Sequence, residues 1–202
     1  MAETEITVQV FNDPIEIEKV VRASGFEPVR KFEMRDRYFT KLSDPKAAAY
    51  EELLNASLII REVAEDNVQV TALLHKKKTF DEAGNVISEE KFKTPLTDAD
   101  SAATVLEMSG LERWCTVRNS SVVYKNKDGD EFALQKINGL GTFIEWEADD
   151  KLAEKLTPEA VFVVLKKKVS ALGLKLGEDY SCKKPFMILH NGDGSASSKE
   201  NN

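Results

Sequence analysis

Short stretches in which apolar and polar residues alternate recur along most of the chain. In the first of them, Ile6, Val8 and Val10 share one side, and the polar residues between Glu3 and Gln9 share the other. Successive side chains of a β-strand point to opposite faces, so this pattern predicts a strand with one apolar and one polar face. Comparable patterns, separated by turn signals, predict further strands at 29–39, 58–63, 68–77, 86–94, 116–125, 131–137 and 142–147.

Three longer segments carry helical signals instead. The first follows a cap at Asp13 and ends at Gly25, and the third begins after Thr157. The second repeats the first, because Ser-Gly-Phe-Glu at 24–27 returns as Ser-Gly-Leu-Glu at 109–112, 85 residues later (24 to 109). The chain is therefore predicted to consist of two related halves, each with a strand, a helix and several further strands.

This order of elements predicts an α+β fold. We expect an eight-stranded antiparallel β-barrel or tunnel with helices packed outside, built from the two related halves. Residues 1–190 would form this single domain, and the Gly-, Ser- and Asn-rich residues 191–202 would form a disordered polar tail. If the apolar strand faces pack outward against the helices, the polar faces line the interior.

The stretch Gly-Leu-Gly-Thr-Phe-Ile-Glu-Trp-Glu at 139–147 carries the most chemical information. In a strand, Glu145 and Glu147 share one face, and Ile144 and Trp146 share the other. Carboxylates one pleat apart repel each other, so such a face meets either water or something cationic. Taken alone, the pattern favours a solvated sheet face.

Inside a closed sheet the same face would meet charges from the other strands. The interior would then collect Glu3, Glu5, Arg61, Lys76, Arg118, Glu145 and Glu147. Arginine and lysine neutralise phosphate oxygens and paired carboxylates hold a hard cation, so this set suits a polyphosphate bound with a divalent metal. A self-satisfied network of ion pairs explains the set equally well. Of the three lysines at 76–78, the last two are interpreted as solvated.

Composition narrows the classes of function. A chain of 202 residues with 42% hydrophobic and 31% charged residues is typical of a globular protein, and its net charge of -7 argues against a general nucleic-acid binder. The sequence shows neither an apolar run of membrane-spanning length nor signal-peptide features, so we expect a cytoplasmic monomer or homodimer without membrane or nucleic-acid partners. With two histidines and two cysteines, any metal would be oxygen-liganded, such as Mg²⁺ or Mn²⁺.

From residue 3 to about 189 the sequence resembles the CYTH family of triphosphate tunnel proteins, which includes class IV adenylyl cyclases, thiamine triphosphatases and inorganic triphosphatases. The resemblance is carried by Gly-Phe-Glu at 25–27 leading to Arg-Asp-Arg-Tyr-Phe at 35–39, and by the stretch 139–147, which is similar to the family's Gly-Leu-Gly-x-Phe-x-Glu-x-Glu. The order and spacing are most similar to the adenylyl-cyclase-like branch. The resemblance implies an eight-stranded tunnel that binds a nucleoside or other triphosphate with Mg²⁺ or Mn²⁺.

The resemblance also implies roles for individual residues. Glu3, Glu5, Glu145 and Glu147 would hold the metal, and Arg61, Lys76 and Arg118 would bind phosphates. An active member would convert ATP to cyclic AMP and pyrophosphate, or would hydrolyse a triphosphate.

Several positions depart from the family pattern. Thr7 stands in place of the signature lysine, and Ile59, Ser121 and Gln135 are uncharged where members are commonly ionised. Losing one hydrogen-bond donor that stabilises the charge developing in a transition state commonly lowers the rate about 100- to 1000-fold. A lysine from another strand, such as Lys91, could restore the lost positive charge. The alternative is therefore a catalytically degenerate member that binds a ligand or a partner protein.

Overall fold

The computed structural model describes residues 4–191, and eight strands in this part of the chain form one continuous sheet. They are β1 (Glu5–Val10), β2 (Glu27–Thr40), β3 (Leu58–Glu65), β4 (Val68–Phe80), β5 (Val86–Pro95), β6 (Glu112–Lys125), β7 (Glu131–Ile137) and β8 (Gly141–Glu147). Their order across the sheet is β1-β8-β7-β6-β2-β3-β4-β5, and every neighbouring pair is antiparallel. All eight predicted strands are present, with ends that differ by a few residues.

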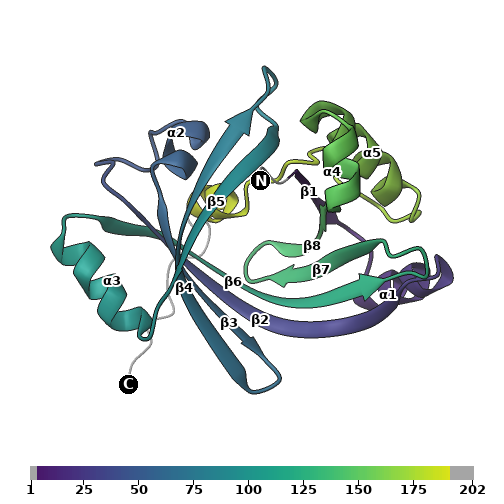
Figure 1. Ribbon diagram of the computed structural model, residues 1–202, viewed down its shortest axis with the longest axis horizontal. Coiled ribbons are helices and arrows are strands. Elements are labelled where there is room, and N and C mark those ends of the chain that lie inside the picture. The colour runs from purple at the N-terminus through teal and green to yellow at the C-terminus, as the bar shows by residue number, and fades with distance from the viewer. Residues whose placement is uncertain (1–3, 192–202) are drawn as a thin grey trace.

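The sheet curls into a half-barrel, with α1 and α3 at its two ends (Figure 1). The helices are α1 (Pro14–Ala23), α2 (Tyr50–Asn55), α3 (Ala99–Met108), α4 (Asp150–Lys155), α5 (Pro158–Ser170) and α6 (Lys184–Asn191). The predicted α+β fold with antiparallel strands and surrounding helices is confirmed. No helix within residues 4–191 is long and apolar enough to cross a bilayer. From residue 192 on, the predicted polar tail lies outside the described residues.

The two related halves appear as equivalent helix–strand units. The bounds of α3 and β6 are those of α1 and β2 shifted by 85 residues (14 to 99 and 27 to 112). Gly25 and Gly110 follow the two helices with φ values of 85° and 82°, a conformation that L side chains rarely adopt. β2 and β6 pair with each other, so the halves meet in the middle of the sheet.

The outer faces of the strands carry the largest apolar core. Ile144 and Trp146 of β8 are buried there with residues of α1 and α5. The Trp146 ring lies 5.1 Å from that of Phe132 and 5.7 Å from that of Phe26, measured between centroids. Glu145, between the two apolar residues, faces the inside of the curve. The alternation predicted for 142–147 is therefore confirmed, with its carboxylate face turned inward.

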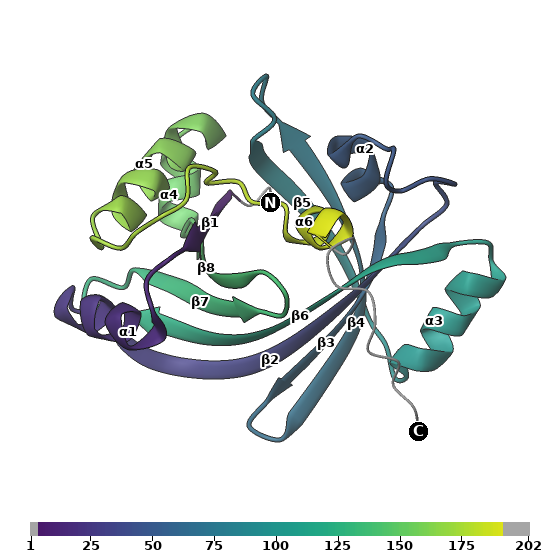
Figure 2. The ribbon, with the colours of Figure 1, turned by 180° about the vertical axis from the view of Figure 1, so that it is seen from behind.

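The inner face of the sheet is not uniformly polar. It contains a buried apolar cluster of Tyr38, Ile59, Leu74, Cys115, Val117, Ile137, Leu140 and Phe143. Met187 and Ile188 of α6 pack against this cluster, and Figure 2 shows α6 across the open side of the curve. The prediction of a polar interior is therefore correct for the part of the inner face that lines the charged cavity and wrong for the part that forms this cluster. The apolar part is covered by α6, a helix that the sequence pattern did not predict.

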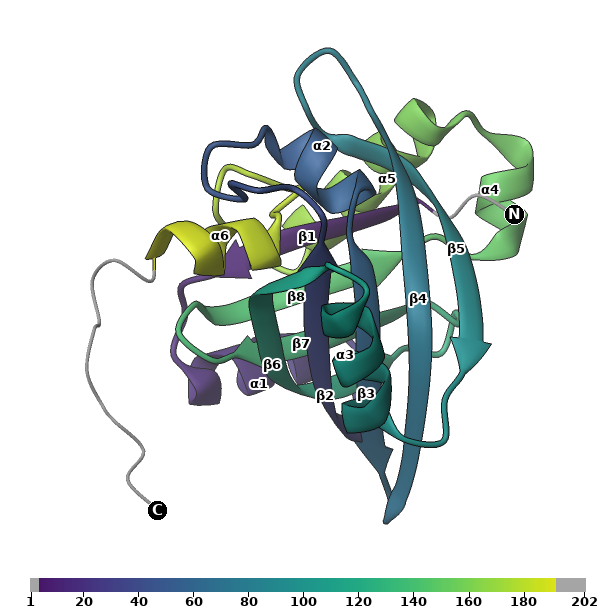
Figure 3. The same cartoon turned by 90° about the vertical axis from the view of Figure 1, so that its left-hand side faces the viewer.

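The chain segment 174–182 bridges the two edge strands, β1 and β5. The Thr7 amide donates to the Tyr180 carbonyl at 3.0 Å, and the Cys182 amide donates to the Thr7 carbonyl at 2.9 Å. On the other side, the Val86 amide donates to Ser181 Oγ at 2.8 Å. The segment thus lies between the two edge strands and leads the chain to α6, which Figure 3 shows on the left, beside the strands.

Candidate functional site

The concave side of the half-barrel encloses a charged cavity of about 190 Å³, which we call the tunnel pocket. The cationic side chains that line it are Arg61, Lys76, Lys78, Lys91, Lys183 and Lys184. The carboxylates that line it are Glu5, Asp36, Glu145 and Glu147. The fold therefore brings together Arg61, Lys76, Glu5, Glu145 and Glu147 from the predicted site, which are far apart in the sequence.

Two predicted site residues do not join this group. Arg118 is exposed and lines surface hollows on the other side of the sheet. Its neighbours Val117 and Asn119 line the tunnel pocket, so strand alternation turns Arg118 outward and corrects its expected place in the interior. Glu3 lies outside the described residues.

Three lysines from β4 and β5 surround one buried carboxylate. Glu89 is 1% exposed, and its oxygens contact Lys76 Nζ at 2.7 Å, Lys78 Nζ at 2.5 Å and Lys91 Nζ at 3.4 Å. β4 continues to Phe80, so residues 76 and 78 share its inner face, and the solvated interpretation of Lys78 is wrong. Lys77, between them, is exposed as predicted. The three ammonium groups thus converge on one buried carboxylate from two neighbouring strands.

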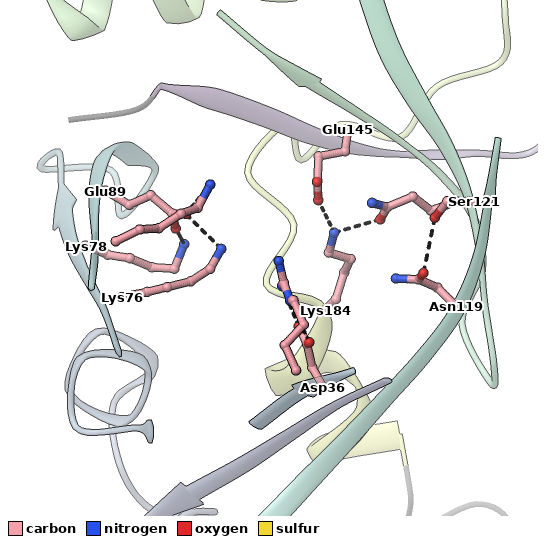
Figure 4. A network of polar contacts seen from close by, with 11 residues as sticks. Asp36, Lys76, Lys78, Glu89, Asn119, Ser121, Glu145 and Lys184 are labelled. Atoms are coloured by element: carbon pink, nitrogen blue, oxygen red, sulfur yellow. Dashed lines mark hydrogen bonds and ion pairs between the residues drawn. The ribbon is translucent and has the colours of Figure 1, made fainter. Parts of the chain in front are cut away.

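A second polar cluster lies on β8 and α6. Lys184, the first residue of α6, forms an ion pair with Glu145 and donates to Gln135 Oε1 at 2.8 Å. Figure 4 shows Lys184 and Glu145 on one side of the tunnel, with Lys76, Lys78 and Glu89 on the other. Sequence reasoning missed Lys184, since two lysines before a proline carry no sign of a tunnel position.

Two further polar contacts lie on the pocket wall between these clusters. Arg61 binds Asp36 through two hydrogen bonds, Nε to Oδ1 at 2.8 Å and Nη2 to Oδ2 at 2.6 Å. Ser121 Oγ bonds Asn119 Oδ1 at 3.1 Å, whereas the buried Asn119 Nδ2 has no hydrogen-bond partner among the described residues. A buried donor without an acceptor is costly, and the Asn119 amide is left unsatisfied where this residue borders the pocket.

The pKa values of the carboxylates follow their surroundings. Burial, followed by repulsion from Glu145 and Glu89, raises the pKa of Glu5. Burial alone would also raise the pKa of Glu145, but the charge and hydrogen bond of Lys184 outweigh it and hold the pKa at about 2. Burial is likewise outweighed at Glu89, where Lys76 and Lys78 hold the pKa well below its ordinary value. Glu145 and Glu89 are therefore ionised at neutral pH.

Acidification should remove stability through Glu145. Its folded pKa of about 2 lies below the ordinary value of 4.5, so its contribution is complete above pH 4.5 and is lost as the pH falls toward 2. We expect this loss to be about 3 kcal/mol in the free energy of unfolding. Urea unfolding between pH 6 and pH 3 should show a shallower pH dependence for Glu145→Gln than for the wild type. Identical slopes would contradict the assignment.

The pocket carboxylates meet only part of what a divalent-metal site requires. Carboxylate oxygens suit Mg²⁺ or Mn²⁺ chemically. The Lys184 ammonium, however, already binds Glu145, and residues 4–191 contain no group of three or more His, Cys, Asp or Glu side chains placed to hold a metal. The described residues therefore do not fit a divalent-metal centre as they lie.

Thiol chemistry is also disfavoured on the inner side of the sheet, where Cys115 is buried in the apolar cluster and Cys182 lines the pocket. Burial, with repulsion from Asp36, raises the pKa of Cys115 to about 12. Burial, followed by repulsion from Asp179, raises the pKa of Cys182 to about 11. Both cysteines are therefore protonated at neutral pH, the form in which a thiol is a poor nucleophile.

Solved structures with similar folds include proteins of the CYTH type. PH1819 from Pyrococcus horikoshii OT3 is 24% identical, with 92% of this chain and 98% of that chain covered and a TM-score of 0.69. HpAC1 from Hippeastrum, for which a dominant triphosphatase activity is described, is 16% identical, with 94% and 96% covered and a TM-score of 0.57. A chain of the Schizosaccharomyces pombe Mediator head module is 12% identical, with 87% and 98% covered and a TM-score of 0.58.

At these identities the likeness establishes the fold, and it confirms the CYTH resemblance at that level. The chain thus has the fold of these CYTH-type structures, with a charged pocket on its concave side. No family model matches the sequence, and neither does any curated protein. Any activity must therefore be argued from the pocket itself.

Proposed function

We propose that this protein binds a short polyphosphate, either inorganic tripolyphosphate or the triphosphate group of an organic molecule, in the tunnel pocket. The observation that carries the proposal is the convergence of Lys76, Lys78 and Lys91 on the single carboxylate of Glu89. Phosphate oxygens are strong acceptors for ammonium donors, so a polyphosphate suits this cluster of lysines. The unpartnered Nδ2 of Asn119 supports the same assignment, since it adds a neutral donor to the pocket wall.

The size of the pocket favours the inorganic chain. Its volume of about 190 Å³ lies below the range of about 300–1,000 Å³ that is typical for pockets enclosing drug-sized ligands. A phosphate chain suits this volume better than a complete nucleotide, whose nucleoside would remain outside. Calorimetry should therefore show tighter binding of tripolyphosphate than of ATP or thiamine triphosphate. Equal affinity for ATP and tripolyphosphate would contradict this size argument.

The lysine cluster provides the direct test of binding. We expect Lys76→Met to weaken tripolyphosphate binding by about 10- to 100-fold, because one charge-assisted contact is lost. Lys77→Met is a matched control, since this lysine is on the same strand and points outward. Calorimetry at fixed ionic strength separates the two variants. The proposal is wrong if wild-type protein binds no tripolyphosphate, or if both substitutions have the same effect.

The resemblance implies Mg²⁺ or Mn²⁺ as a cofactor, so each titration is repeated with either ion and with a chelator. The same samples, assayed for phosphate, pyrophosphate and cyclic AMP, test for catalysis. Turnover of ATP or of a triphosphate would support the enzymatic form of the proposal. Tight binding without any product would support binding alone.

A second candidate function is binding without chemistry, by a degenerate member of the fold class. Specific observations favour it: Glu145 is paired with Lys184 and Asp36 with Arg61, so charges of the predicted reaction site already have partners. Such pairs lower the charge available to a metal or a transition state. Absence of turnover, together with retained tripolyphosphate binding, would select this alternative.

A further inference from the structure

We infer that Lys184 supplies the cationic group that β1 lacks in the tunnel, and that its ammonium binds a phosphate group of the ligand beside Glu145. The inference rests on the proposed polyphosphate function. It adds to the binding site a residue from the C-terminal helix, which lies far from β1 in the sequence.

The pairing of β1 with β8 defines the position where a cation is missing. Thr7 lies directly opposite Glu145 in this antiparallel register, and both residues line the tunnel pocket. Side chains that face each other across two strands have Cβ atoms about 4.5–5.5 Å apart. A lysine at residue 7 would thus lie within reach of the Glu145 carboxylate, whereas the threonine present there brings no charge.

The chain that follows α5 delivers a lysine to the same place. The Cys182 amide donates to the Thr7 carbonyl at 2.9 Å, and this hydrogen bond holds the segment 174–182 beside β1. Two residues later the Lys184 side chain, 14% exposed, enters the pocket and forms its ion pair with Glu145. The ammonium that a lysine on β1 would provide therefore comes from the start of α6.

The Lys184 ammonium has donor capacity beyond its protein contacts. Of its three N–H donors, the contacts within the described residues use one for Glu145 and one for Gln135 Oε1. Lys76 and Lys78 lie on the other side of the pocket (Figure 4). A linear phosphate chain between the two sides would have ammonium groups at both ends, so Lys184 and the lysine cluster fit a polyphosphate better than they fit a single phosphate.

The experiment moves the lysine from residue 184 on α6 to residue 7 on β1 and asks whether the binding affinity follows. Tripolyphosphate affinity is measured by calorimetry for the wild type, Lys184→Met, the double variant Thr7→Lys with Lys184→Met, and the control Lys77→Met. We expect Lys184→Met to bind about 10- to 100-fold more weakly than the wild type. The double variant should recover to within about 3-fold of the wild type, and Lys77→Met should be unchanged.

Thermal unfolding of each variant shows that the protein measured is folded. The inference is overturned if Lys184→Met binds tripolyphosphate as tightly as the wild type. It is also overturned if the folded double variant remains as weak as Lys184→Met, because Lys184 would then act only by docking α6. A wild-type protein that binds no tripolyphosphate overturns the proposed function, and this assignment with it, which is a different result from either of the first two.

Discussion

Glu89→Ala should destabilise the protein by about 3–5 kcal/mol at neutral pH, the usual cost of removing one partner from a buried ion pair. The substitution removes the one buried carboxylate that Lys76, Lys78 and Lys91 all contact. Their side chains are only 12–27% exposed, so water screens this repulsion poorly. Chemical denaturation should show a lower midpoint, and the melting temperature should fall by about 10 °C.

The adjacent Glu90→Ala provides the control. Glu90 is exposed on the opposite face of β5, so its removal should change the free energy of unfolding by less than about 0.5 kcal/mol. Tripolyphosphate should restore part of the melting temperature lost by Glu89→Ala, because its oxygens replace the missing carboxylate. Equal effects of the two substitutions would show that the lysines do not depend on Glu89.

Trp146→Ala should destabilise the protein by about 3–5 kcal/mol through loss of the buried ring and the cavity left behind. Trp146 is 3% exposed, and its ring packs against Phe132 and Phe26 on the outer side of the sheet. Lys168 Nζ also lies 5.9 Å from the ring centroid, a cation–π contact that disappears with the ring. Equilibrium unfolding in urea measures the loss.

Phe92→Ala is the matched aromatic control, because Phe92 is 57% exposed on β5 and its removal leaves no buried cavity. We expect this control to cost less than about 1 kcal/mol. Trp146 lies on the face opposite Glu145, so folded Trp146→Ala protein at low temperature should keep its affinity for tripolyphosphate within about 3-fold. A large loss of affinity in that folded protein would contradict the separation of the two faces.

The alternation along β8 shows how far local sequence can predict a site. Glu145 and Glu147 alternate with Ile144 and Trp146, and this fixes which side chains share a face. The pattern leaves open whether the carboxylate face meets water or a cavity. The curl of the sheet decides this, because it turns that face toward β4, β5 and α6.

Arg118 and Lys78 show the opposite case, in which resemblance and charge runs mislead. Both lie on strands whose existence was predicted, yet Arg118 faces outward and Lys78 faces the pocket. The face of the sheet on which a side chain lies depends on the register of its strand and on where the strand ends. A shift of one residue moves every side chain of the strand to the opposite face. A run of lysines contains no information about that register.

By itself, the sequence determined the eight strands, the two related halves and the inward or outward grouping of side chains within β8, because these follow from local periodicity and from the repeat. Only the tertiary structure decided that Lys184 reaches Glu145, and that Glu89 collects three lysines. The Lys184 contact joins residues distant in the chain and depends on segment 174–182, which runs between β1 and β5 to α6. The lysines meet Glu89 through the pairing register of β4 with β5, which local periodicity does not fix.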